Sequence, residues 1–378
     1  MNQPIKPAEA AQGLTRHDLP TPSLLVDLDV VEGNIEKMSR RLAAARVGLR
    51  PHVKSHKCPE IARRQLAAGA VGICVATIRE AEAMADAGID GLLITSQMAG
   101  EDKTRRLIRL TRRLPRTLSV VDHLEHACRL EAAAGVAGVV LNVLIDIDPN
   151  IHRSGIRAGD PAVRLAEQIS LMKHLKLGGV QCYSADSSHV VGHEARRKHS
   201  TDAMVPAIET FRRVQQSGIP VEIMSGGSTG TYDIDTELPG LTELQAGSYV
   251  YLDVDYRRIG GREGKEFADF GQALTVLATV ISCNHPGLAT VDAGYKAFAT
   301  DRPFGPAVKH GEGIAYRFAG DEHGMIDFPE SGAPIRLGDR LEFIVPHCDP
   351  NVNLYDRVYA LRGETVEAVW PIARGYEP

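Results

Sequence analysis

The chain has 378 residues, 43% of them hydrophobic and 24% charged, which is typical of a folded globular protein and excludes fibrous and disordered chains. The length favours two domains, one of them a large barrel. Its 43 Lys and Arg against 48 Asp and Glu give a net charge of −5, and no stretch concentrates basic residues, so we expect no nucleic-acid partner.

The first 22 residues, which end at Pro22, mix polar residues with Ala, Pro and single Ile and Leu residues. They contain no apolar core of a signal peptide, and no window of about 18 uninterrupted apolar residues follows, so the sequence predicts a cytoplasmic protein with no membrane span. The 6 cysteines stand singly, without a C-x-x-C pair. They predict neither a disulfide framework nor a zinc ribbon.

Between residue 23 and about residue 249, short β-branched runs alternate with segments in which apolar residues recur every three or four positions. Apolar strands separated by amphipathic helices are typical of a parallel sheet that is covered on both faces. Eight or nine repeats favour a closed (β/α)8 barrel. The runs are SLLVDLDV from Ser23, RPHVK ending at Lys54, GICVAT, GLLITS, LSVVD, VVLNVLIDID, GGVQCYS, VEIMSGG and ELQAGSY.

The pattern changes after about Asp255. Segments such as ALTVLATVISCN, AYRFAGDEHGMIDF and DRLEFIVPHC are short, alternate in polarity and are separated by Gly, Pro and Asp. They predict an antiparallel β domain. We therefore expect an α/β protein with a (β/α)8 barrel over residues 22–255 and a β domain made of residues 1–21 and 256–378.

Lys54 ends the second apolar run, beside His52 and His56. Reactive residues of such barrels lie at the C-terminal ends of the strands. Desolvation and neighbouring positive charge would lower the pKa of Lys54 there and free its amine for Schiff-base chemistry. The alternative is a surface lysine just past the strand.

The segment SGGSTG, residues 225–230, follows a late barrel strand. Consecutive glycines let the backbone approach an anion, and the N–H and hydroxyl groups can bind a phosphate, although the same letters also suit a simple turn. A lysine at one strand end and a phosphate site at another suggest pyridoxal 5'-phosphate, abbreviated PLP. We assign cofactor binding here to Ser225, Gly226, Gly227, Thr229 and Gly230.

Several sequence blocks occur in order from about Thr21 to Arg374: TPSLLVDLD, RPHVKSHKCPE, SGGSTG, TELQAGSY with DVDY, DAGYK, DEHG and PHCDPNVNL. In these blocks the chain resembles the D-threonine aldolase and D-serine dehydratase family of fold-type III PLP enzymes, which pair an alanine racemase-like barrel with a β domain. The resemblance implies that Lys54 forms the Schiff base with PLP. It also implies a homodimer.

The resemblance assigns further roles by position. Arg153 matches an arginine near the cofactor, Tyr183 matches a tyrosine that faces the pyridine ring, and His189 matches a histidine that acts as base on the substrate hydroxyl. The sequence departs from many relatives just after the tyrosine, where Ser184 and Asp186 lie in a stretch that commonly holds histidine and glycine.

A polar cluster follows on a helical stretch. It predicts a solvated helix face without a role in the site, and its members are His193, Glu194, Arg196, Arg197 and His199.

His347 and Asp349 are separated by one residue in the block PHCDP. On an extended strand both side chains would point to one face and chelate a cation, with Cys348 pointing away. An imidazole and a carboxylate without a thiolate suit Mn²⁺, with Mg²⁺, Co²⁺ or Zn²⁺ as alternatives. In the family that the chain resembles, dehydratases carry H-x-C and aldolases H-x-D, so Asp349 favours the aldolase.

The sequence thus predicts a PLP- and metal-dependent lyase that cleaves D-threonine and related D-β-hydroxy-α-amino acids to glycine and an aldehyde. One alternative is β-elimination, the dehydration of D-serine or D-3-hydroxyaspartate in the same site. A second is a non-catalytic PLP carrier, against which the β domain and its H-x-D pair argue.

Overall fold

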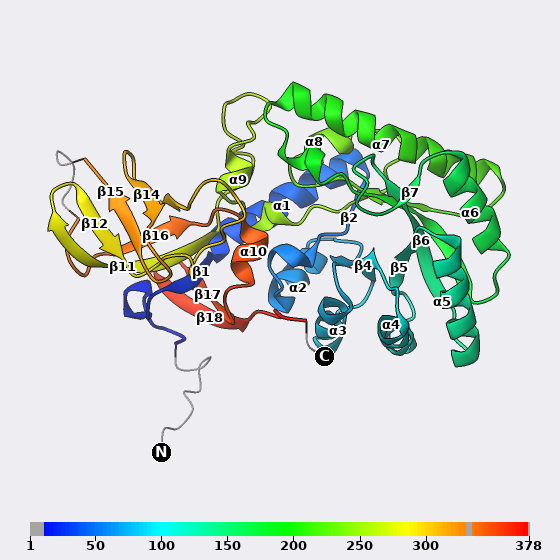
Figure 1. Ribbon diagram of the computed structural model, residues 1–378, viewed down its shortest axis with the longest axis horizontal. Helices are drawn as coiled ribbons and strands as arrows, with labels where there is room; N and C mark the ends of the chain where they lie inside the picture. Colours follow the sequence, from blue (N-terminus) through cyan, green and yellow to red (C-terminus); the bar gives the residue numbers. More distant parts are fainter. Residues whose placement is uncertain (1–10, 330–334, 377–378) are drawn as a thin grey trace, which may run out of the picture.

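The computed structural model describes residues 11–329 and 335–376 of the chain. The predicted place of residues 1–10 in the β domain lies outside these ranges, as do residues 330–334 and 377–378. The described residues form a barrel and a β domain that lie side by side (Figure 1).

A parallel sheet forms the barrel. Its strands are β2 (Gly48–Leu49), β3 (Ile73–Val75), β4 (Leu92–Gln97), β5 (Leu118–Val121), β6 (Leu141–Asp148), β8 (Leu175–Cys182), β9 (Ile223–Gly226) and β10 (Glu243–Leu244). They run in the order β2-β10-β9-β8-β6-β5-β4-β3, and an isolated parallel bridge between His52 and Cys74 connects the two ends. A short strand, β7 (Ile156–Arg157), pairs with the end of β6. The predicted (β/α)8 barrel is confirmed.

Helices cover the outside of the barrel, which is why strands such as β5 are buried along their whole length. Polar caps fix where helices begin: Asp27 accepts hydrogen bonds from the N–H groups at the start of α1, and Thr77 does so for α3. The helices are α1 (Leu28–Ala45), α2 (Pro59–Ala67), α3 (Ile78–Asp86), α4 (Glu101–Arg113), α5 (Leu124–Ala137), α6 (Asp160–Ser170), α7 (His193–Gln216) and α8 (Tyr232–Asp235).

The strand β1 (Ser23–Asp27) is not part of the barrel, although the sequence predicts it as the first barrel strand. It pairs antiparallel with β11 (Leu274–His285) and parallel with β17 (Arg357–Arg362), both in the second sheet. An apolar run has the same pattern in either sheet, and only partners far along the chain decide where it pairs. The start of the predicted barrel range 22–255 therefore lies with the β domain.

The β domain is mostly antiparallel, as predicted, and the contact of β1 with β17 is its parallel exception. The strand order is β14-β15-β12-β11-β1-β17-β18, with β16 beside β11 and β13 beside β16. The further strands are β12 (Leu288–Val291), β13 (Ala307–Val308), β14 (Ala315–Phe318), β15 (Gly324–Asp327), β16 (Arg340–Ile344) and β18 (Thr365–Pro371).

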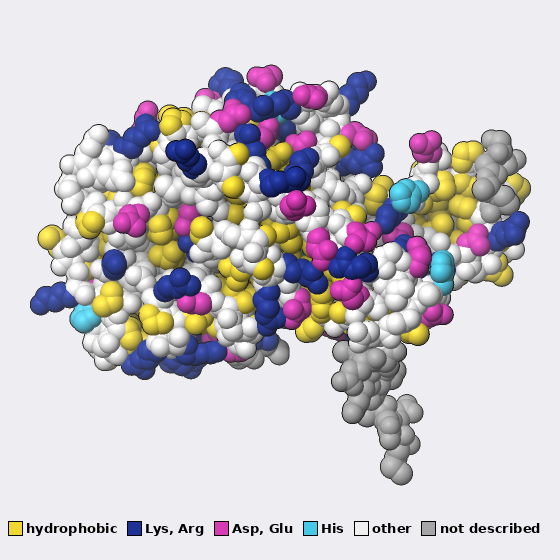
Figure 2. All heavy atoms as spheres, turned by 180° about the vertical axis from the view of Figure 1, so that it is seen from behind, with side chains coloured by type: hydrophobic (Ala, Val, Ile, Leu, Met, Phe, Trp, Pro, Cys, Tyr) yellow, Lys and Arg dark blue, Asp and Glu magenta, His cyan; other side chains and the backbone are white. Residues whose placement is uncertain are grey.

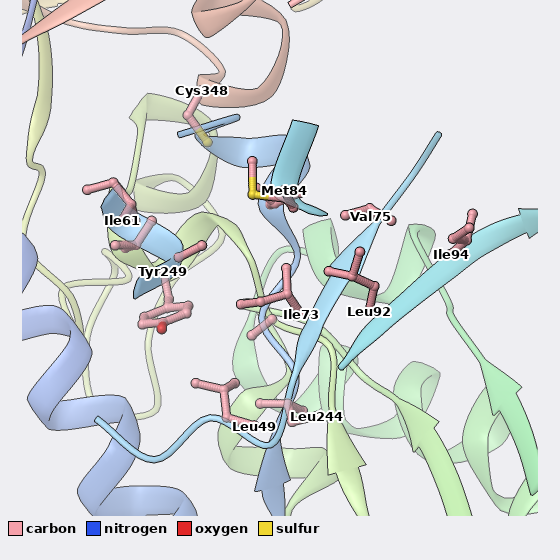
Figure 3. Close-up of a cluster of buried hydrophobic side chains, with 14 of the residues drawn as sticks. Leu49, Ile61, Ile73, Val75, Met84, Leu92, Ile94, Leu244, Tyr249 and Cys348 are labelled. Carbon is pink, nitrogen blue, oxygen red and sulfur yellow. The ribbon is translucent and has the colours of Figure 1, made fainter. Parts of the chain in front are cut away.

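One hydrophobic core runs through the junction of the two parts. Figure 3 shows Leu49, Leu244 and Tyr249 of the barrel in the same cluster as Cys348, which begins the short helix α10 (Cys348–Val352). Each fully buried aliphatic or aromatic side chain of this kind contributes about 1.5–3 kcal/mol. This burial holds α10 against the turn that carries Lys54.

Basic and acidic side chains are interspersed over much of the face in Figure 2, in keeping with the nearly balanced composition. Among the described residues, no helix has both the length and the apolar character that crossing a bilayer requires.

Candidate active site

Lys54 lies where two lobes of a cavity meet at the C-terminal ends of the barrel strands. The first lobe, here the Arg153 lobe, has a volume of about 300 Å³, and the second, the His347 lobe, of about 450 Å³. Both lobes are lined by His52, Lys54, Tyr183 and Gln245. These residues follow β2, β8 and β10, so the position at the strand ends agrees with the prediction for Lys54.

Lys54 sits in a short 3-10 turn, Val53–Ser55, that His52 caps by accepting a hydrogen bond from the Lys54 N–H. Its Nζ lies 3.1 Å from Oδ2 of Asp349 and 5.5 Å from the centre of the Tyr183 ring. The neighbouring acidic groups of Tyr183 and Asp349 outweigh desolvation and raise the pKa of Lys54. This corrects the predicted lowering, which considered desolvation and the basic residues nearby in sequence but not Tyr183 and Asp349.

Asp349 enters the site from the β domain. Burial alone would raise the pKa of its carboxyl, but the positive charges of Lys54 and His347 outweigh burial and hold that pKa well below its usual value. Asp349 is therefore ionised, as a metal ligand must be.

His347 and Asp349 both line the His347 lobe, but not as alternate residues of a strand. His347 has an extended backbone and precedes α10, and Asp349 lies in the first turn of that helix. The predicted strand geometry is wrong here, because the chain turns into a helix directly after His347. The side chain of Cys348 is fully buried in the core (Figure 3), but it does not simply point away as predicted, because its Sγ donates a hydrogen bond to Oδ1 of Asp349 at 3.4 Å.

The His347 ring is held by a carboxylate. Its Nδ1 lies 2.7 Å from Oδ2 of Asp301, which leaves Nε2 as the ring nitrogen for a ligand. A histidine that binds a metal commonly has its second nitrogen fixed in this way.

These residues fit a divalent cation with an open coordination sphere. The described residues contain no group of three or more His, Cys, Asp and Glu side chains arranged to hold a metal ion. The protein would thus contribute one imidazole and one carboxylate from His347 and Asp349, and leave the remaining positions to water or substrate. Such an open sphere suits a catalytic ion.

His189 lies at the end of a 3-10 turn, Asp186–His189, and lines the His347 lobe. Its Nδ1 is 3.0 Å from Oδ2 of Asp255, in a contact that is close but not aligned as a straight hydrogen bond. Burial would raise the pKa of Asp255, but the hydrogen-bonding and charge of His189 and Arg302 lower it overall. An ionised carboxylate beside Nδ1 favours a proton on that nitrogen and leaves Nε2 as an acceptor.

Arg153 and Tyr183 lie on the other side of Lys54. Arg153 lines the Arg153 lobe from the loop after β6, and its guanidinium is 5.7 Å from the centre of the Tyr183 ring. The structure thus brings Lys54, Arg153 and Tyr183 together around one cavity, as the resemblance implies.

The SGGSTG loop contributes less of the cavity wall than predicted. Of its residues, Ser228 and Thr229 line the His347 lobe. Ser225 is fully buried and accepts a hydrogen bond from Gln245, so its hydroxyl faces the barrel interior. Glycine is required behind the wall because a Cβ would clash at Gly226, Gly227 and Gly230, and Gly227 also has a φ of +72°.

The phosphate group of PLP nevertheless fits the cavity wall around Thr229 and Gly247. The N–H groups of Thr229 and Gly247 donate to no atom of the described residues, although both residues are buried. Buried donors without a partner are rare and call for a ligand. Together with the hydroxyl groups of Ser228 and Ser248, they would hold the phosphate of PLP, with Lys54 in the same lobe.

Arg196 corrects the prediction of a solvated face at the start of α7. Its side chain is fully buried, and His193 beside it is buried too, because the segments around Gly230 and Gly260 cover this helix turn. The guanidinium donates hydrogen bonds to the carbonyl oxygens of Val190, Gly230, Ile259 and Gly260. Arg196 therefore ties the SGGSTG loop to two other loops at the barrel mouth.

Sequence reasoning gave no role to Asp255, Asp301 or Arg302. Asp255 lies in the quoted block DVDY, so a signal existed for that residue. Arg302 lines the His347 lobe from the loop after β12, where its neighbours in sequence show no pattern.

The comparisons with known proteins agree with this architecture. Residues 26–255 match the family of the alanine racemase N-terminal domain, and residues 273–361 match the serine dehydratase domain family. The chain is 35% identical to D-threonine aldolase of Arthrobacter sp., over 98% of this chain and 96% of that protein. It is 33% identical to 3-hydroxy-D-aspartate aldolase of Paracoccus denitrificans (strain Pd 1222), over 97% of this chain and 95% of that protein.

Solved structures are also similar. The crystal structure of D-threonine aldolase from Filomicrobium marinum superimposes with a TM-score of 0.91 at 35% identity, covering 96% of this chain and 97% of that one. D-threo-3-hydroxyaspartate dehydratase from Delftia sp. HT23 gives a TM-score of 0.84 at 31% identity, with 96% and 100% covered.

Proposed function

The chain belongs to the D-threonine aldolase and D-serine dehydratase family, and we propose that it is a lyase that cleaves D-threonine and related D-β-hydroxy-α-amino acids to glycine and an aldehyde. The observation that carries the proposal is the pairing of Lys54 with Asp349 in the cavity that also holds His347 and His189. A lysine for PLP, two ligands for a cation and a base thereby border one space.

Two cofactors are part of the proposal. Lys54, Ser228 and Thr229 would hold PLP, and His347 with Asp349 would hold a divalent cation, for which the imidazole and carboxylate favour Mn²⁺. When bound, PLP supplies an acceptor for the electrons of the broken Cα–Cβ bond, and the cation polarises the β-hydroxyl as a Lewis acid.

The residues of the chain handle the proton. Asp255 holds His189 through Nδ1, so that Nε2 is the atom that accepts the proton of the β-hydroxyl. Asp301 holds Nδ1 of His347 and thereby fixes the orientation of that ring. Tyr183 and Arg153 line the wall on the other side of Lys54 and position the bound cofactor.

The site supports carbon–carbon cleavage over β-elimination because of Asp349. Cys348 stands between the two ligands in sequence and is buried, and burial raises the pKa of its thiol far above its usual value. The cation would therefore meet a carboxylate and an imidazole without a thiolate. Dehydration of D-3-hydroxyaspartate is the second candidate function. The chain is 35% identical over 286 residues to D-threo-3-hydroxyaspartate dehydratase of Delftia sp. (strain HT23).

The experiment is a product assay with D-threonine, PLP and Mn²⁺, with and without a chelator. Equal amounts of glycine and acetaldehyde, lost on chelation and absent with L-threonine, would support the proposal. Ammonia and 2-oxobutanoate in their place would mean that the protein is a dehydratase.

We also propose that the working form is a homodimer, as the family resemblance implies, and that it is located in the cytoplasm. Light scattering coupled to size-exclusion chromatography measures the first point, and a mass of twice 40.9 kDa is expected. A monomer that is fully active would contradict it.

A further inference from the structure

Arg302 reaches the His347 lobe from the loop between β12 and β13. Its Nε donates a hydrogen bond to Oδ2 of Asp255 at 2.7 Å, and its Nη1 is 3.9 Å from Oδ2 of Asp301. The side chain is 28% exposed. Two carboxylates thus fix the guanidinium from one side and leave part of it accessible.

The same two carboxylates hold the reactive histidines. Asp255 is also the partner of His189, and Asp301 is the partner of His347. Arg302 is therefore adjacent to both the proposed base and the proposed metal ligand. In the proposed function His189 and the cation on His347 both act on the substrate hydroxyl at Cβ. The substrate group nearest to Arg302 is then the other substituent of Cβ.

We propose that Arg302 is a specificity-determining residue that binds a carboxylate on the β-carbon, so that the protein prefers dicarboxylic D-β-hydroxy-α-amino acids such as D-3-hydroxyaspartate. This inference rests on the proposed function and names its substrate class. Cleavage breaks the Cα–Cβ bond, the hydroxyl loses its proton and becomes an aldehyde, and Cα gains a proton. The products are glycine and glyoxylate.

The free end of the guanidinium suits this ligand. Neither Nη1 nor Nη2 donates a hydrogen bond to any of the described residues. A planar pair of N–H donors matches the two oxygens of a carboxylate. Because Nε is already held by Asp255, little conformational entropy is lost when a ligand binds.

The wall around Arg302 argues against an apolar substituent. The aliphatic side chains of the His347 lobe are Ala185 and Val190, and most other lining residues are polar or ionisable. A methyl or phenyl group would gain little burial of apolar surface there. Asp186, an acidic residue of the wall, is exposed, so solvent screens its repulsion of an anion.

Arg302 and Arg153 would not compete for the same carboxylate. Arg153 lines the Arg153 lobe but not the His347 lobe, and Arg302 lines the His347 lobe but not the Arg153 lobe. Lys54 stands between the two lobes. A substrate whose hydroxyl lies at the His347 lobe therefore meets Arg302 at its β-carbon.

The test compares kcat/KM for D-3-hydroxyaspartate and for D-threonine in the PLP- and Mn²⁺-loaded protein and its variants. We expect the unmodified protein to favour the dicarboxylate by at least about tenfold, and Arg302→Met to lower kcat/KM for it by roughly 100-fold. For D-threonine the loss should stay below about fivefold, since only the contact of Arg302 with Asp255 is removed. Arg302→Lys should fall between.

The matched control is Arg317→Met. Arg317 is exposed on β14 and pairs with Asp327 at 3.1 Å in the β domain, outside the cavity wall. Its removal should change neither kcat/KM value.

A binding readout separates recognition from turnover. Malate and 3-hydroxybutyrate are 3-hydroxyaspartate and threonine without the amino group, and calorimetry measures their binding to the loaded protein. Malate should bind at least tenfold more tightly, and Arg302→Met should remove that difference.

Three results would overturn the inference. Equal losses for both substrates in Arg302→Met would mean that Arg302 acts on their common part or through Asp255. An unmodified protein that cleaves D-threonine well and the dicarboxylate poorly would refute the preference and leave the proposed function standing. Cleavage of neither substrate would refute both.

Discussion

The Nζ atom of Lys54 lies 3.1 Å from Oδ2 of Asp349, although Lys54 follows a barrel strand and Asp349 belongs to α10, which lies between β16 and β17 of the β domain. The pair joins the residue proposed to carry PLP to a residue proposed to bind the cation. Tyr183 and, after it, Asp349 raise the pKa of Lys54, and the charge of Lys54 in turn lowers the pKa of Asp349.

Replacement of Lys54 should abolish cofactor attachment. We expect Lys54→Ala to lose the absorbance band of lysine-bound PLP and to lower turnover of D-threonine by more than about 1,000-fold, because the nucleophile is gone. Lys296→Ala is the control, since Lys296 is an exposed partner of Glu322 in the β domain. A Lys54→Ala protein that keeps both the band and the turnover would show that another lysine binds PLP.

Asp301 should govern metal affinity through His347. Loss of the carboxylate that holds Nδ1 frees the ring to turn, and such a change weakens metal binding by roughly 10–100-fold. Titration of the PLP-bound Asp301→Asn protein with Mn²⁺ measures this. Asp321→Asn, a change at an exposed acidic residue of the β domain, is the control. An unchanged affinity in Asp301→Asn would remove His347 from the ligand set.

Arg196 should hold the loops of the barrel mouth in place. Arg196→Met would leave the carbonyl oxygens of Val190, Gly230 and Gly260 without a donor among the described residues, while that of Ile259 keeps its hydrogen bond from the Gly192 N–H. We therefore expect the free energy of unfolding to fall by roughly 3 kcal/mol and the affinity for PLP to fall with it. Urea denaturation and PLP titration measure the two effects. Arg197→Met, at the neighbouring and partly exposed Arg197, should change little.

Asp235 makes stability depend on pH. Desolvation raises the pKa of its buried carboxyl to about 6, against the hydrogen bonds from Ser200 and Thr231 that lower it. The folded protein therefore binds more protons at this site than the unfolded chain between about pH 4 and pH 6, and stability falls as the pH rises through that window, by up to about 3 kcal/mol. Above about pH 6 the ionised group remains destabilising.

The contribution of Asp235 to the pH dependence of stability is measured by comparing the unmodified protein with Asp235→Asn. Denaturation of the unmodified protein and of Asp235→Asn at pH 4.5 and pH 7 should show that the variant loses the part of the decline that Asp235 causes, since an amide does not titrate. Identical pH slopes for the two proteins would mean that the pKa of Asp235 is not raised.

The sequence predicts those parts of the fold that depend on the local spacing of apolar residues. The alternation of strands and helices gave the barrel, and short alternating segments gave the β domain. The place of β1 (Ser23–Asp27) was not predictable, because it depends on pairing with β11 and β17, which lie far along the chain. The burial of Arg196 was missed for the same reason, since distant loops cover its helix.

The candidate site likewise contains residues that the sequence predicts and residues that only the structure reveals. The residues Lys54, His347 and Asp349 stand in short motifs, and the structure places them around one cavity. Arg302 and Asp301 belong to the loop after β12, and only the folded structure shows that this loop lies at the barrel mouth. The geometry at His347 also differed from the expected strand, because a single residue step ends an extended segment and starts a helix.

The central claim is that the protein breaks the Cα–Cβ bond. The direct measurement is NMR spectroscopy of the PLP- and Mn²⁺-loaded protein with D-threonine that is ¹³C-labelled at Cα. We expect the label in the methylene carbon of glycine, with acetaldehyde in equal amount, and neither product from the Lys54→Ala protein. Label in C2 of 2-oxobutanoate, released with ammonia, would contradict it.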